Sequence, residues 1–205
     1  MIDNARIVRE ALSHKGSHED PMGSNTGPFV ILCQRATFLG GTKWPWCAAF
    51  VCYVCERAGV PLAYNGAGAH DLADHHPPSV PQNRWEPGMV VDFNIGSGHT
   101  GILVSHTATS VKTVDGNWGD AVTEHDTPTS FVRKVWAIPG VSYKAGTAPT
   151  PPKKKLPAWV VTTSAKGTQK VVFRAAKKSQ LVRWLTTHNL ARLFPNGVTI
   201  KRGKG

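Results

Sequence analysis

Two short segments of this chain hold side chains that could together carry out nucleophilic acyl transfer. In the first, the thiol of Cys47 stands two residues after Pro45 and opens a run of apolar and small residues that extends to Ala58. The run predicts a buried helix with Pro45 in its first turn and a left-handed stop at Gly59. A cysteine at such a helix start faces unpaired N–H groups and the positive end of the helix dipole, which favour the nucleophilic thiolate. The alternative is that Cys47 is a small core residue, as most free cysteines are.

The second segment begins at His99, which opens an alternating strand after a Gly/Ser turn. Another strand follows a short polar break and ends in Asp115 and Asn117. In a hairpin centred near Ala108, His99 lies opposite Asn117, and Gly101 lies opposite Asp115. The histidine, the aspartate and the asparagine would then share one face of the sheet. A loop one residue longer or shorter would send them to opposite faces.

These side chains supply the parts of a cysteine-dependent acyl transfer. Such a reaction needs a thiolate, an imidazole within hydrogen-bond reach, and an acceptor that holds the ring in the right tautomer. Cys47 would be the nucleophile and His99 the base, and the side-chain oxygen of Asp115 or Asn117 could orient the ring. Taken singly, His99 is more often a structural histidine and the Asp-Gly-Asn sequence a turn. The three segments together favour a Cys/His enzyme.

At these residues the chain resembles the CHAP domain, a family of cysteine, histidine-dependent amidohydrolases and peptidases in the papain-like superfamily. The resemblance rests on the blocks Trp-Cys-Ala-Ala-Phe-Val, Gly-His-Thr-Gly-Ile and Asp-Gly-Asn-Trp, and residues 23–28 and 87–91 also fit its pattern. It covers roughly residues 1–140 and none of the remaining chain. It implies an α+β fold in which the nucleophile lies on a helix packed against an antiparallel sheet.

The same resemblance implies hydrolysis of amide bonds in bacterial peptidoglycan. It assigns Cys47 as nucleophile, His99 as base and Asn117 as the residue that orients it, and Asp115 stands where relatives often have glutamate. One departure is that Met89 follows Gly88 where the family frequently has Gly-Asp. The bond could be that of an N-acetylmuramoyl-L-alanine amidase or of a peptidoglycan endopeptidase, since both use the same residues. A non-catalytic wall-binding module and a papain-like hydrolase of another amide remain as alternatives.

Charge divides the chain into two parts. Residues 1–140 carry 10 Lys and Arg against all 13 Asp and Glu, whereas residues 141–205 carry 14 basic residues and no acidic one. A stretch rich in Pro and Lys marks the border and should act as an extended spacer. We therefore expect a small basic α/β domain with a strand near 169–174, a helix near 179–190 and a final strand near 196–201. The predicted boundaries are 1–142 for the catalytic domain, 143–157 for the linker and 158–205 for the basic domain.

The basic domain is expected to bind a polyanion. For a lysin the natural partner is an anionic wall polymer, such as teichoic acid or phosphorylated wall glycan, or lipopolysaccharide. Nucleic acid is the alternative ligand, and simple solubilisation or retention by charge without a defined site is the alternative to any specific binding. A charge run alone specifies no ligand.

Location follows from what the sequence lacks. No apolar run reaches the length of a membrane span, and the first residues show neither the basic flank nor the apolar stretch of a signal peptide. We expect a monomeric, bacteriolytic and hence antimicrobial phage endolysin, made in the host cytoplasm and released to the cell wall through a holin pore.

No metal or cofactor is expected. Cys47, Cys52 and Cys55 have a spacing similar to ferredoxin ligands, but no cysteine follows Cys55, so core packing of reduced thiols is the better interpretation. The histidine-rich stretch at 70–76 runs into two prolines and is expected to be a loop or a short helix. Trp44 and Trp118 lie near the motifs and are expected to line a substrate groove.

Overall fold

The computed structural model describes residues 2–143, 158–163, 171–174 and 198–202. The chain divides into two compact units, Met1–Pro151 and Pro152–Gly205, and the division falls inside the predicted linker. Each unit is described separately. Most of that linker, 144–157, and the helix predicted near 179–190 lie outside the described residues.

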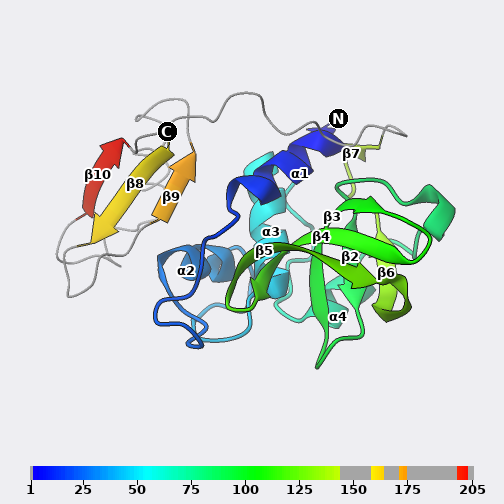
Figure 1. Ribbon diagram of the computed structural model, residues 1–205, viewed down its shortest axis with the longest axis horizontal. Coiled ribbons are helices and arrows are strands. Elements are labelled where there is room, and N and C mark those ends of the chain that lie inside the picture. The colour runs from blue at the N-terminus through cyan, green and yellow to red at the C-terminus, as the bar shows by residue number, and fades with distance from the viewer. Residues whose placement is uncertain (1, 144–157, 164–170, 175–197, 203–205) are drawn as a thin grey trace. The chain divides into compact units, whose positions relative to one another are not determined.

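The first unit is an α+β fold built on a five-stranded antiparallel sheet with the strand order β5-β4-β3-β2-β6 (Figure 1). Two short strands at the ends of the unit, β1 and β7, form a separate parallel pair. The strands are β1 (Ile2–Asp3), β2 (Val90–Phe93), β3 (His99–His106), β4 (Ser110–Trp118), β5 (Ala121–Pro128), β6 (Val132–Trp136) and β7 (Val141–Ser142).

Four helices and two short 3-10 turns complete the first unit, and α3 is the central helix. Ten of its twelve residues are buried, as the nearly uninterrupted apolar run requires. It packs against β3 and β4 and also contacts the two helices that precede it (Figure 1). The elements are α1 (Asn4–Ser13), α2 (Pro28–Arg35), α3 (Cys47–Ala58), α4 (Ala69–Asp74), η1 (Gln82–Arg84) and η2 (Thr129–Phe131).

Helix α3 ends where the sequence predicts, but it begins slightly later than predicted. The helix stops at Gly59, whose φ of 86° is the left-handed conformation predicted for that glycine. It begins at Cys47, with Trp46 as the N-cap residue, so Pro45 precedes the helix rather than occupying its first turn. Cys47 is therefore the first helical residue.

The hairpin of β3 and β4 has the predicted register next to the site. Ile102 pairs with Val114 and Leu103 with Thr113, which continues the expected pairing of Gly101 with Asp115. The register shifts by one residue beyond Leu103, toward the loop. This irregularity leaves the end that carries His99 unchanged.

The second unit has a three-stranded antiparallel sheet in the order β10-β8-β9. The strands are β8 (Ala158–Thr163), β9 (Val171–Arg174) and β10 (Val198–Arg202). Strands β9 and β10 overlap the two strands predicted from the sequence. Among the described residues, no helix has the length and apolar character needed to cross a membrane.

Candidate active site

Cys47 lies at an open helix N-terminus. Its side chain is nearly buried, with 6% of the residue surface exposed. The N-cap residue Trp46 makes no side-chain capping bond, and the first turn of α3 holds no acidic residue. The backbone N–H groups and the dipole of α3 therefore act on the sulfur without competition from a capping carboxylate.

Side chains from the N-terminal segment fix the approach to this helix. The fully buried Trp46 donates its indole N–H to Glu19 Oε1 at 2.9 Å, and the other oxygen of Glu19 accepts from the backbone N–H of Asn25 at 2.7 Å. Gln34 donates to the carbonyl of Trp44 at 2.8 Å and to that of Asn25 at 3.0 Å. These bonds join the loop before α2 to the loop before Cys47.

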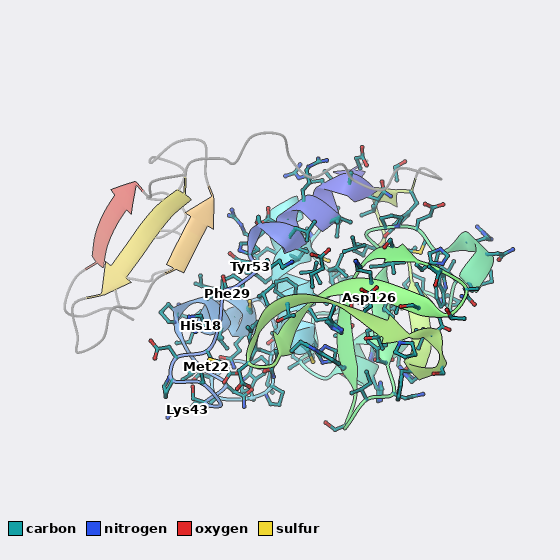
Figure 2. All side chains as sticks on the ribbon, viewed as in Figure 1. His18, Met22, Phe29, Lys43, Tyr53 and Asp126 are labelled. Carbon is teal, nitrogen blue, oxygen red and sulfur yellow. The ribbon has the colours of Figure 1, made fainter. Side chains whose placement is uncertain are left out.

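Aromatic packing holds α2 on α3 further along. The rings of Phe29 and Tyr53, both labelled in Figure 2, meet edge to face with centroids 5.5 Å apart. Phe29 also contacts the rings of Trp46 and Phe50. The cysteine is thus presented by a rigid element, as a nucleophile requires.

His99 connects the cysteine to a buried carboxylate. Its Nε2 lies 2.9 Å from Oδ2 of Asp115, whose side chain is completely buried. Burial alone would lower the pKa of His99, but hydrogen bonds and negative charge from Asp115 and Cys47 raise that pKa to about 10. Because Asp115 engages Nε2, Nδ1 is the ring nitrogen left for the thiol. The arrangement favours the protonated form of His99.

A glycine leaves the space for this carboxylate. A Cβ atom added to Gly101 would overlap the carboxylate of Asp115. Gly101 is two residues from His99 on the same strand, so the carboxylate crosses the empty position to reach the imidazole. A second glycine, Gly116, lets β4 approach α3, because a Cβ there would overlap Phe50 and Trp46.

Asp115 also contacts a second histidine that sequence reasoning missed. His125 Nε2 lies 2.7 Å from the same Oδ2 atom. Burial would raise the pKa of Asp115, but the hydrogen bonds and positive charge of His125 and His99 bring it below its ordinary value. The carboxylate is therefore ionised near neutral pH.

One sequence signal could have located His125. Gly119 and Asp120 both have φ of 60°, as in the two-residue hairpin loops that join twisted strands. Strand β5 then pairs with β4 so that Asp115 lies opposite Thr123. His125, two residues further on, must share the face of Asp115. A Gly-Asp pair between two alternating strands carries this information.

Asn117 does not occupy the position expected for it in an uninterrupted strand. Its φ is 61°, and the pairing of β4 with β5 is irregular between Asp115 and Trp118. The left-handed residue breaks the alternation of side chains, and the Asn117 amide donates to the side chain of Asn25 at 3.2 Å. The structure thus places Asp115, rather than Asn117, in hydrogen-bond contact with His99.

The two predicted groove tryptophans lie in different settings. Trp118 stacks on His125, with ring centroids 3.8 Å apart, and meets the edge of His99 at 5.1 Å. It therefore covers both imidazoles. Trp44 is partly exposed in the loop before Cys47, and its indole donates to the carbonyl of Gly40 at 3.1 Å.

A second buried acid near the site has a structural role. Asp92 accepts from His70 Nδ1 at 2.9 Å and from Arg133, which also bonds Asp74. These bonds tie α4 to β2 and β6. The ring of His70 lies against Gly98, next to His99. Asp92 thus braces the strand end that carries the base.

The same central residues include a candidate metal-binding group. In the described part of the chain, ligand atoms of His99, Asp115 and His125 lie within 4.8 Å of one another.

The four cysteines are all free and buried. Burial raises the pKa of the Cys52 thiol to about 12, and it raises the pKa values of Cys33 and Cys55 well above the ordinary value of a thiol. These three cysteines therefore remain protonated near neutral pH.

Comparison with known proteins adds no relative: no protein-family model and no curated protein matches the chain. The function is therefore inferred from the geometry of the site and from its sequence motifs.

Proposed function

We propose that the protein is a cysteine hydrolase of the papain-like, CHAP-domain type that cleaves amide bonds in bacterial peptidoglycan. The observation that supports this most is that His99 of β3 interacts both with Cys47 of α3 and with Asp115 of β4. Nucleophile, base and orienting acid are held in the order that acyl transfer uses.

In the proposed mechanism the Cys47 thiolate attacks the carbonyl carbon of the scissile amide. The backbone N–H of Cys47 at the start of α3 stabilises the oxyanion of the tetrahedral intermediate. His99, held as the imidazolium, gives its proton to the leaving amine, and a thioester forms. The neutral His99 then takes a proton from water, the resulting hydroxide attacks the thioester, and the carboxylic acid product leaves.

The choice of peptidoglycan rests on the motif resemblance and on charge. The basic unit, with its 14 Lys and Arg after residue 140, suits an anionic wall polymer or lipopolysaccharide. We propose that it holds the enzyme at the wall, as a phage endolysin released from the host cytoplasm by a holin. Nucleic acid is a less fitting partner, because the resemblance is to wall hydrolases.

The substrate is tested by mass spectrometry of purified peptidoglycan after digestion. Peptides freed from intact glycan strands would identify an amidase, and cut stem peptides or cross-bridges would identify an endopeptidase. If sacculi of several wall chemotypes stay intact with the reduced enzyme, the substrate assignment is wrong. A papain-like hydrolase of another amide, or a non-catalytic wall-binding module, would then take its place.

A second candidate uses the same side chains differently. His99, Asp115 and His125 could hold Zn²⁺, which would make the protein a metal-dependent hydrolase. The placement of Cys47 beside His99 favours the thiol mechanism instead. Dialysis against a chelator separates the two: hydrolysis that persists excludes the metal mechanism, and hydrolysis that stops and returns with Zn²⁺ excludes the thiol mechanism.

A further inference from the structure

Two imidazoles share one oxygen of a fully buried carboxylate. The distance from Asp115 Oδ2 is 2.7 Å to His125 Nε2 and 2.9 Å to His99 Nε2. The other oxygen, Oδ1, has no hydrogen-bond partner among the described residues. The two imidazole N–H groups are therefore the donors that the described structure provides for this buried charge.

His125 is itself held in one orientation. Its Nδ1 lies 3.2 Å from the hydroxyl oxygen of Thr127, which is buried, and its ring stacks on Trp118 at an interplanar angle of 12°. When the Thr127 hydroxyl donates to Nδ1, the ring proton resides on Nε2, toward Asp115. A line of polar contacts thus runs from Thr127 to His99.

Other charged groups of β5 are engaged elsewhere. Glu124 and Asp126, the neighbours of His125, pair with Lys15 at 2.7 Å and Lys112 at 3.5 Å. The titratable groups that act on the Asp115–His99 pair are Cys47 from α3 and His125 from β5.

We propose that His125 is a positioning residue for the cysteine chemistry: its ring holds the Asp115 carboxylate in place behind His99. Asp115 in turn holds the His99 ring toward Cys47. The part that concerns turnover rests on the proposed function. The reactivity of the thiol toward a small alkylating reagent tests the inference without any peptidoglycan.

Two substitutions in the full-length protein separate positioning from packing. His125→Phe keeps a ring for Trp118 but removes the N–H group, whereas His125→Gln keeps an N–H donor. Thr123→Val is the matched control on the same strand, because it removes a hydroxyl that donates to the Trp118 carbonyl at 3.0 Å. The probe is iodoacetamide, and labelling of Cys47 is followed by mass spectrometry as a function of pH.

His125→Phe loses one charge-assisted hydrogen bond to Asp115, so Cys47 should be labelled about tenfold more slowly near neutral pH. The increase of the labelling rate with pH should also occur at a higher pH in this variant. His125→Gln should recover most of the rate, and Thr123→Val should behave like the wild type. On a hydrolysed substrate, kcat should fall in His125→Phe while KM stays nearly constant.

A wild-type labelling profile in folded His125→Phe would overturn the inference. So would a His125→Gln variant that is folded but as slow as His125→Phe. If labelling shifts as expected while wild-type protein leaves every peptidoglycan intact, the proposed substrate fails and the role of His125 stands.

Discussion

Among single residues, the buried carboxylate that His99 and His125 share is central to the proposed chemistry. Asp115 contacts both imidazoles, whereas the amide of Asn117 donates to Asn25. In the proposed mechanism the orienting role therefore goes to Asp115. Its negative charge also does what a neutral amide cannot, since it stabilises the protonated ring of His99.

This assignment predicts unequal effects at the two positions. Asp115→Asn should lower kcat about 10³-fold, because a neutral amide cannot balance the charge of the imidazolium and can also present its NH₂ group to the ring. Asn117→Ala should cost less than about tenfold, because it removes a contact outside the Cys47–His99–Asp115 series. Steady-state kinetics on both variants checks the order, and a larger loss in Asn117→Ala would refute it.

The pH dependence of hydrolysis follows from the raised pKa of His99. The imidazolium supplies the proton for the leaving amine, and it loses that proton as the pH rises through about 10. We therefore expect kcat/KM to fall as the pH rises through about 10. In Asp115→Asn the fall should begin at lower pH, because the charge that raises the pKa is gone. An unchanged alkaline limb in that variant would contradict this explanation.

At the scale of elements, one helix and one hairpin build the site. Helix α3 presents the thiol, and β3 and β4 present the base and the acid. Gly101 leaves room for the Asp115 carboxylate beside His99, and Gly116 leaves room for α3 against β4. Strand β5 adds His125 through the Gly119–Asp120 turn.

Substitution at Gly101 tests this arrangement. Gly101→Ala puts a methyl group where the Asp115 carboxylate lies, so the carboxylate must move away from His99. A displacement of about 1 Å at such a site costs about 10² in rate. Kinetics and thermal unfolding of Gly101→Ala and of Ser105→Ala, a substitution at an exposed position of the same strand, measure the effect. Equal activity in the two variants would count against the close packing.

These elements also show how far the sequence predicts the site. The apolar run that ends at Gly59 predicts the helix, and the alternating pattern of the two strands predicts the register of their hairpin. Cys47, His99 and Asp115 could therefore be named from the sequence. The position of Asn117 could not, because its left-handed backbone and the strand irregularity beside it depend on how β4 pairs with β5. His125 requires the same third strand. Local patterns identified the pairing of β3 with β4 but not the third strand, β5, which brings His125 to Asp115.

At the scale of the whole molecule, charge and compactness divide the chain in the same region. The acidic residues all lie before residue 141, and the second unit begins at Pro152. The first unit, of modest charge, is thus followed along the chain by a strongly basic unit. This distribution of charge suits the proposed enzyme, whose substrate is embedded in an anionic surface.

Removal of the second unit tests that division. A chain ending at Pro151 should lose far more activity on intact cells or sacculi than on soluble peptidoglycan fragments, because only the former present the polyanion. The difference should be largest at low salt, where electrostatic attraction is least screened. Equal losses on both substrates would show that the basic unit supports the catalytic unit and does not target it.

In the proposed mechanism the thiol of Cys47 breaks the amide bond. The most direct measurement is the rate at which new amino termini appear in purified peptidoglycan with wild-type protein and with Cys47→Ala, under reducing conditions and with matched circular dichroism. We expect steady release by the wild type and a rate lower by about 10⁴-fold or more in the variant. Release by folded Cys47→Ala at a rate near that of the wild type would contradict it.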